Sequence, residues 1–191
     1  MSRRLPHRRP IARRRDAELL QRGKPLLDLK RYFGAKGIRV HEVQFGTITD
    51  AFYAFHIDVI VCPIRPGLLM HNPERPFLTD EAPKLFKQND WEIVEAVGPT
   101  FEYDEVLDSF GTPRKGPNPI FMNTLSIGPN TICVEAHEER YMEQLDKMGI
   151  EVIPVPYDKV VPFGGSLHCT TVDVNRDDKL EDYFPKQIPG Y

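Results

Sequence analysis

The chain has 191 residues, of which 40% are hydrophobic and 28% are charged, a composition that can bury one core and excludes a flexible tail or linker. Its net charge is −3, but seven arginines lie within the first 15 residues, so the rest of the chain carries a net charge of −10. This acidic body excludes a protein that clamps nucleic acid with a dense positive surface. The longest apolar stretch, near Val59–Cys62, is far shorter than the roughly 20 residues of a membrane-spanning helix.

Residues 1–24 form a basic leader that we expect to be disordered, followed by one domain over residues 25–191. The leader is rich in arginine and free of acidic residues, as organellar targeting segments are, but it is short and contains Pro6 and Pro10. A targeting segment and a non-native start caused by truncation are the two other interpretations. Location therefore stays open between mitochondrion and cytoplasm.

Hydrophobic spacing predicts a first helix over Pro25–Ala35, which ends at Gly37, and then a strand over Ile38–Phe45. A strand over Ile57–Pro63, a turn and a second strand over Leu68–His71 follow. The next expected elements are a helix and a strand: Asp80–Asn89 and Trp91–Val97.

The same order returns in the C-terminal half, with two strands, a helix and a third strand. Their expected ranges are Met122–Ile127, Thr131–Ala136, Glu138–Met148 and Ile150–Pro156. The unit strand-strand-helix-strand thus recurs roughly every 60 residues, which indicates a radial or stacked α/β architecture. A closed ring needs more units than this chain holds, so we expect the N-terminal units of the fold to be missing.

The repeat also aligns two histidines. His56 lies nineteen residues after Gly37, and His168 lies nineteen residues after Gly149. Equivalent positions of a rotational repeat lie at the same radius, so we expect both histidines to face one central cavity.

The three cysteines, Cys62, Cys133 and Cys169, are widely spaced, which indicates neither a disulfide framework nor a zinc site and favours a reducing compartment. Cys62 and Cys133 lie inside apolar runs and are expected to be small packed side chains. Cys169 follows Gly164-Gly165-Ser166-Leu167-His168 and precedes a strand-like run over Thr171–Val174. Glycines allow close approach of a ligand, and a nearby cation can lower the pKa of a thiol, so we interpret Cys169 as a nucleophile rather than as a packed hydrophobe.

Two further motifs offer polar chemistry. On a strand, His56 and Asp58 would share one face, where they could move a proton and bind a cation, or simply bond to each other. Asn72-Pro73-Glu74-Arg75-Pro76 predicts a turn, in which Arg75 is either a clamp for a carboxylate or a solvated arginine.

These motifs together resemble the arginine:glycine amidinotransferase family, which includes the inosamine-phosphate amidinotransferases. The resemblance covers about Gly37–Tyr183 and corresponds to the C-terminal portion of a family member. The segments that carry it are Phe55-His56-Ile57-Asp58, Asn72-Pro73-Glu74-Arg75-Pro76, Met122-Asn123 and Gly164-Gly165-Ser166-Leu167-His168-Cys169-Thr170-Thr171-Val172-Asp173-Val174.

The resemblance implies a partial α/β propeller of the pentein type, built from ββαβ units, with no metal and no other cofactor. It also implies that Cys169 attacks the guanidinium carbon of arginine and that His56 transfers the protons of the leaving and accepting amines. Asp58 would bind the guanidinium group and Arg75 the substrate carboxylate, with His168 and Ser166 as further substrate-binding residues. The partners are then arginine and an amine, with glycine as the default acceptor, without nucleic acid or a membrane span, and dimerisation is expected by likeness.

The sequence departs from the family pattern at three places, the smallest change being Ser166, where a third glycine is common. The family uses acidic residues of earlier units, one of which pairs with the catalytic histidine, and this sequence begins after them. Ser109–Phe121 lies where family members carry a loop with serine and tryptophan. Two alternatives therefore stay open: a guanidine hydrolase of the deiminase type on the same fold, and a truncated, inactive half-propeller with a binding role.

Overall fold

The computed structural model describes residues 26–41, 57–77, 80–107, 113–175 and 181–187, which belong to two compact units. In the first unit, residues 26–34 form a helix, close to the expected Pro25–Ala35. Residues 38–41 are not a strand, so this part of the expected strand Ile38–Phe45 is wrong, because no described residue pairs with it. The expected leader lies outside the described residues. Within the described part of the chain, no helix is long and apolar enough to cross a bilayer.

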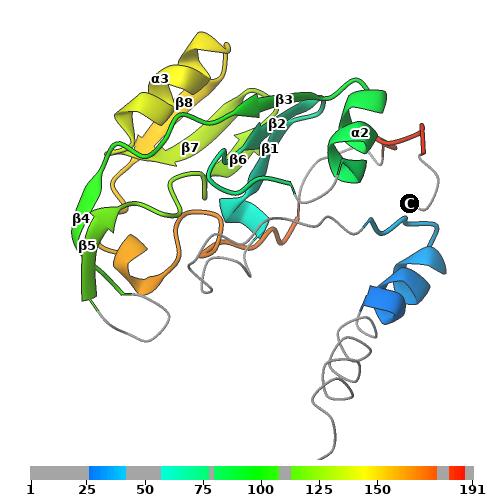
Figure 1. Ribbon diagram of the computed structural model, residues 1–191, viewed down its shortest axis with the longest axis horizontal. Helices are drawn as coiled ribbons and strands as arrows, with labels where there is room; N and C mark the ends of the chain where they lie inside the picture. Colours follow the sequence, from blue (N-terminus) through cyan, green and yellow to red (C-terminus); the bar gives the residue numbers. More distant parts are fainter. Residues whose placement is uncertain (1–25, 42–56, 78–79, 108–112, 176–180, 188–191) are drawn as a thin grey trace, which may run out of the picture. The chain divides into compact units, whose positions relative to one another are not determined.

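The second unit contains two copies of a β-β-α-β arrangement (Figure 1). The first copy comprises β1 (Val61–Arg65), β2 (Leu68–His71), α2 (Glu81–Gln88) and β3 (Glu92–Glu95). The second copy comprises β6 (Leu125–Gly128), β7 (Thr131–Glu135), α3 (Glu139–Lys147) and β8 (Glu151–Val155). In both, the first two strands are antiparallel, and the helix crosses over to a third strand that runs parallel to the second. The predicted repeat is confirmed.

Three described helices end with the same hydrogen-bonded turn. Shortly after the end of each helix, a single residue takes a positive φ. The backbone N–H of the residue that follows it donates to the carbonyl five residues earlier, at 3.0–3.1 Å. The residues with positive φ are Gly37, Asp90 and Gly149. Asp90 is the least obvious of these, because a side chain other than glycine is uncommon at this backbone conformation. Its presence explains why the middle helix-to-strand junction resembles the other two only weakly in sequence.

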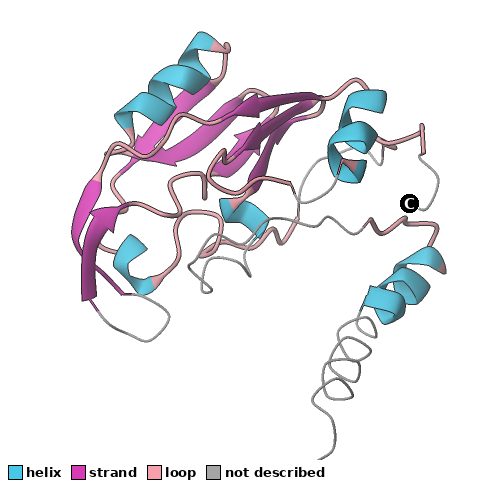
Figure 2. Ribbon diagram, in the orientation of Figure 1, coloured by secondary structure: helices cyan, strands magenta, loops and turns pink. Residues whose placement is uncertain are grey.

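The core forms where β2 and α3 meet. The alternating side chains of β2 face opposite ways: Leu68 and Met70 belong to one hydrophobic cluster, and Leu69 belongs to another. The first cluster also contains Tyr141 and Leu145 of α3, which are fully buried. In the ribbon, α3 lies beside β8 of its own copy (Figures 1 and 2). Its buried side chains also share a cluster with residues of the first copy, so this helix ties the two copies together.

A hairpin of two strands, β4 (Glu102–Leu107) and β5 (Pro113–Pro117), was not expected from the sequence. The proline-rich composition argues against a strand, but prolines are tolerated at strand ends and edges, and β5 begins and ends with one. Buried Glu138 holds the neighbouring chain in place. Its side chain accepts hydrogen bonds from the backbone of Thr100 at 2.7 Å and from Asn118 Nδ2 at 2.8 Å.

Three expected strand boundaries are wrong, because a helical turn, a tight turn and an exposed segment respectively stand where strand pairing was expected. Ile57–Val59 forms a 3-10 helix, η2, and the Val59 carbonyl accepts a hydrogen bond from Asn72 Nδ2 at 3.1 Å. Strand β6 begins three residues later than expected, because the backbone N–H of Asn123 closes a turn onto the Ile120 carbonyl at 2.8 Å. Residues 171–174 form no strand, and their two valines are 84% and 93% exposed.

The role of α3 in joining the two copies can be measured by truncating Leu145. We expect Leu145→Ala to lower the free energy of unfolding by about 2–5 kcal/mol, since it empties a fully buried position in the shared cluster. Lys147→Ala, on the exposed face of the same helix, is the matched control and should leave the denaturation midpoint unchanged. Equal midpoints for the two variants in urea denaturation would contradict this account of the core.

Candidate active site

Three short segments that are not strands meet at one place and carry the polar side chains of the site. They are η2 with Asp58, the turn before β6 with Asn123, and residues 164–171 with Cys169. The last segment begins after η3 (Val161–Phe163), where Gly164 takes a φ of 83° that reverses the chain.

The segment around Cys169 is held by its own backbone. The N–H of Thr170 donates to the Ser166 carbonyl at 3.1 Å, and the hydroxyl of Thr171 donates to the Leu167 carbonyl at 2.9 Å. These bonds form one helical turn that presents Cys169. Gly165 permits the turn, because a Cβ at this position would lie only 3.2 Å from the Cβ of Cys169.

One carboxylate oxygen of Asp58 contacts three polar groups. Its Oδ2 accepts from Asn123 Nδ2 at 2.7 Å, lies 3.0 Å from His168 Nδ1 and accepts from the Cys169 thiol at 3.3 Å. The other oxygen, Oδ1, is buried and has no hydrogen-bond partner among the described residues. The Asp58 side chain is 19% exposed, so this arrangement leaves a shielded negative charge with one unused acceptor.

The electrostatics of this site oppose a thiolate. Burial, first, and the negative charge of Asp58, second, raise the pKa of the Cys169 thiol, whereas hydrogen bonds from the Ser166 backbone and from Asn123 lower it. The lowered pKa expected of a nucleophile is therefore absent from this arrangement. A cation placed against Asp58 would neutralise one of the two opposing causes.

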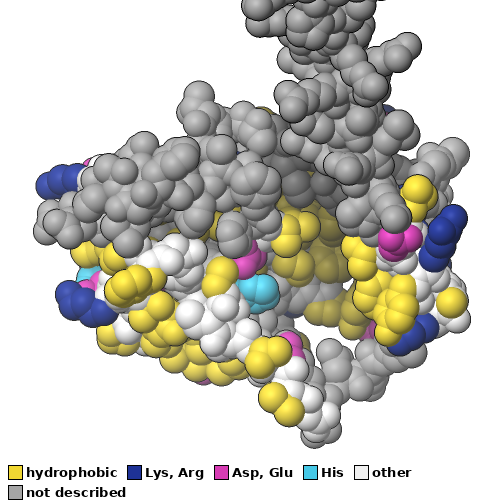
Figure 3. Space-filling model, turned by 90° about the horizontal axis from the view of Figure 1, so that it is seen from below, with side chains coloured by type: hydrophobic (Ala, Val, Ile, Leu, Met, Phe, Trp, Pro, Cys, Tyr) yellow, Lys and Arg dark blue, Asp and Glu magenta, His cyan; other side chains and the backbone are white. Residues whose placement is uncertain are grey.

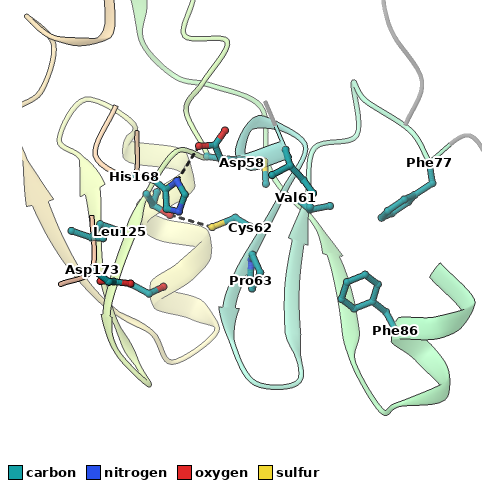
Figure 4. Close-up of a pocket in the computed structure, with 13 residues that line it drawn as sticks. Asp58, Val61, Cys62, Pro63, Phe77, Phe86, Leu125, His168 and Asp173 are labelled. Atoms are coloured by element: carbon teal, nitrogen blue, oxygen red, sulfur yellow. Dashed lines mark hydrogen bonds and ion pairs between the residues drawn. The ribbon is translucent and has the colours of Figure 1, made fainter. Parts of the chain in front are cut away.

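A cavity of about 400 Å³ adjoins these groups, with Asp58 and His168 at one side and Phe77 and Phe86 at the other (Figure 4). Hydrophobic side chains surround a hollow on this face, and a histidine and an acidic side chain lie at its rim (Figure 3). Cys62 also lines the cavity, and burial raises the pKa of its thiol to about 11. The two packed cysteines lie in strands, as expected: Cys62 in β1 and Cys133 in β7.

The structure brings together three of the predicted site residues, Cys169, Asp58 and His168. Ser166 is buried one turn before the thiol. Arg75 is also buried and lies in the predicted turn. Its backbone N–H donates to the Asn72 carbonyl at 3.0 Å, and its backbone carbonyl lies 2.9 Å from His71 Nε2. It is not among the residues that line the cavity.

His56 lies outside the described residues, so the expected meeting of His56 with His168 stays a prediction. The argument that His56 and Asp58 share a strand face is wrong in its premise, because Asp58 lies in the 3-10 helix. Within the described ranges, no three His, Cys, Asp or Glu side chains form a group that could hold a metal ion.

Asn123 is the residue of the site to which the sequence reasoning gave no role. The only signal in the sequence was its place beside Met122 in one of the motifs. There it stands at the start of an apolar run, where a polar amide side chain is unusual for a buried strand. In the structure it is 2% exposed and contacts Asp58, His168 and Cys169.

Comparison with known proteins finds relatives among the amidinotransferases. The chain is 30% identical over 156 residues to L-arginine:L-lysine amidinotransferase of Pseudomonas savastanoi pv. phaseolicola, a match that covers 82% of this chain and 39% of the relative. It is 32% identical over 130 residues to inosamine-phosphate amidinotransferase 1 of Streptomyces glaucescens, which covers 67% of this chain and 34% of that protein. The chain is homologous to part of the amidinotransferases. No protein-family model matches it.

Solved structures of amidinotransferases show the same fold. A saxitoxin-pathway amidinotransferase from Microseira wollei superposes with a TM-score of 0.65 at 26% identity, covering 83% of this chain and 40% of that one. Inosamine-phosphate amidinotransferase from Streptomyces griseus gives 0.54 at 30% identity, covering 68% and 35%. The chain thus has part of a pentein α/β propeller, as the resemblance implied, and spans about a third to two fifths of the length of these relatives.

The effect of the Asp58 charge on the Cys169 thiol can be measured from the rate of alkylation by iodoacetamide as a function of pH. We expect Asp58→Asn to lower the pH midpoint of alkylation and to speed the reaction at neutral pH, because the carboxylate raises the pKa of the thiol. Asp146→Asn, on the exposed face of α3, removes one equal charge and should leave the midpoint unchanged. An unchanged or higher midpoint in Asp58→Asn would show that the carboxylate does not act on the thiol.

The close approach of Gly165 to Cys169 predicts a position-specific effect of one methyl group. Gly165→Ala should slow alkylation of Cys169 by displacing its Cβ, with little change in the thermal midpoint of the protein. Gly98→Ala is the control, since a Cβ there meets nothing within 4 Å. Alkylation of Gly165→Ala at the wild-type rate would mean that the turn adapts without moving the thiol.

Proposed function

We propose that this chain provides the nucleophile and part of the guanidinium site of an amidinotransferase that uses arginine as donor. The observation that carries the proposal is the 3.3 Å contact between the Cys169 thiol and Asp58, whose second carboxylate oxygen is buried and has no partner among the described residues. A guanidinium group carries parallel N–H donors that fit a carboxylate, and its central carbon would then lie beside the sulfur. Homology to part of the amidinotransferases supports the same assignment.

The positive charge of the substrate would offset part of the electrostatic cost of forming a thiolate at Cys169. A guanidinium ion against Asp58 offsets the negative charge that raises the pKa of the Cys169 thiol, so the thiolate becomes accessible when the substrate is present. The thiol proton leaves to a base, for which we propose His56. The same imidazole would protonate the departing amine.

The bond changes then balance in two steps. The Cys169 sulfur bonds to the guanidinium carbon, and the bond from that carbon to the side-chain nitrogen of arginine breaks, which releases ornithine and leaves an amidino group on the sulfur. An acceptor amine then bonds to the amidino carbon and the carbon–sulfur bond breaks. In our proposal, His56 takes the proton that the amine loses and returns it to the Cys169 sulfur. We propose Arg75 as the group that binds a substrate carboxylate, with His168 and Ser166 as further substrate-binding residues.

We propose glycine as the default acceptor, which gives guanidinoacetate as product. Two of the relatives are named for other acceptors, lysine and an inosamine phosphate. The acceptor therefore has to be found by assay with a panel of amines.

The covalent step is tested with arginine labelled at its guanidinium carbon. We expect the full chain to acquire the label on Cys169, identified by peptide mass spectrometry, and to lose it when glycine or another acceptor amine is added, with ornithine released. Cys169→Ala should acquire no label, whereas Cys133→Ala, which changes a packed cysteine in β7, should behave like wild type. Release of citrulline and ammonia alone would identify a guanidine hydrolase, and a folded chain that acquires no label would favour the inactive half-propeller.

A further inference from the structure

We propose that Asn123 is a positioning residue that holds the Cys169 turn against Asp58 and supplies a hydrogen bond to the sulfur. The inference relies on the proposed function only for the identity of the nucleophile. Its test measures the reactivity of the thiol and needs no turnover of arginine.

The carboxamide of Asn123 uses its complete hydrogen-bonding capacity inside the site. Its Nδ2 donates to Asp58 Oδ2 at 2.7 Å and to Cys169 Sγ at 3.1 Å. Its Oδ1 accepts from the backbone N–H groups of His168 at 3.0 Å and Cys169 at 3.1 Å. Two donors and two acceptor positions are all that a primary amide has, and a flipped amide would point its NH₂ at two N–H donors. One side chain therefore joins η2 to the turn that carries the thiol.

The position of Asn123 is itself fixed by the core. Its N–H donates to the Ile120 carbonyl at 2.8 Å, and the N–H of Thr124 donates to the Met122 carbonyl at 2.9 Å. The two preceding residues are nearly fully buried, and the ring of Phe121 packs edge-on against Tyr141 of α3, with centroids 5.4 Å apart. Asn123 thus links the shared core to the turn that carries Cys169.

The amide also affects the ionisation of the sulfur. The titratable groups nearest the thiol are Asp58 and His168, and Cys62 and Asp173 line the adjoining cavity. The negative charge of Asp58 opposes a thiolate, whereas the N–H of Asn123 favours it, because a hydrogen bond to a charged acceptor is stronger than one to a neutral acceptor. An aliphatic residue at position 123 would lose this donor and also leave the backbone N–H groups at 168 and 169 without their acceptor.

The test is the pH dependence of iodoacetamide alkylation at Cys169 in two variants of the full chain. We expect Asn123→Ala to raise the pH midpoint by about one unit, which slows alkylation at neutral pH about tenfold. Asn123→Asp keeps the size of the side chain and its Oδ1 acceptor. We expect its midpoint to rise as well, because the new carboxyl group, whether ionised or sharing a proton with Asp58, no longer donates to the sulfur.

The matched control is Asn130→Asp, which makes the same chemical change at an exposed position on the β6–β7 turn and should leave the midpoint unchanged. Thermal unfolding reports separately on stability. A folded Asn123→Ala or Asn123→Asp with the wild-type midpoint of alkylation would overturn the proposal, and so would a failure of both variants to fold, which would make the residue structural only. Because alkylation needs no arginine, a raised midpoint in a chain that never acquires the amidino label would uphold Asn123 while the proposed function fails.

Discussion

A negative charge and a thiol are held 3.3 Å apart by residues that lie 111 positions apart in the chain. This contact is unfavourable for a nucleophile on its own, because the carboxylate of Asp58 and the partial burial of Cys169 both raise the pKa of the thiol. A cation bound to the carboxylate would offset the effect of its charge, and only the effect of burial would still oppose the thiolate. This pair is the basis of our proposal that the substrate carries a positive charge.

The fold supplies this contact by bringing together the ends of two repeated units. Asp58 precedes the first strand of one unit, Asn123 precedes the first strand of the next, and Cys169 follows the last strand of that second unit. Each of these segments is too short to be rigid alone. Phe121 and Met122, beside Asn123, pack in the cluster around Tyr141 and Leu145. Val59, beside Asp58, and Val161, before the Cys169 turn, pack in the second cluster. The geometry of the site therefore depends on the packing of both clusters.

Homology and structure agree on the family relationship but cover it only in part. The chain spans about a third to two fifths of each amidinotransferase relative, and the solved structures superpose on it over the same share. In the described site, the thiol of Cys169 and the imidazole of His168 each lie within hydrogen-bonding distance of the Asp58 carboxylate. The cavity beside them is lined mainly by apolar side chains.

The sequence by itself determined the repeat, the helices and the strands between them, because hydrophobic spacing and helix-ending glycines such as Gly149 are local signals. It also identified Cys169, Asp58 and His168 through motifs in which residue type and order suffice. It could not locate the start of β1 or β6, where side-chain amides bond to the backbone across the fold, nor the β4–β5 hairpin, whose prolines lie at strand ends. Only the tertiary structure decided that Asn123 joins the site. Its four hydrogen bonds go to three residues in two distant segments, which leave no periodic pattern in the sequence. The upward shift of the Cys169 pKa likewise depends on the burial of the thiol and on its distance from Asp58, which are properties of the folded chain alone.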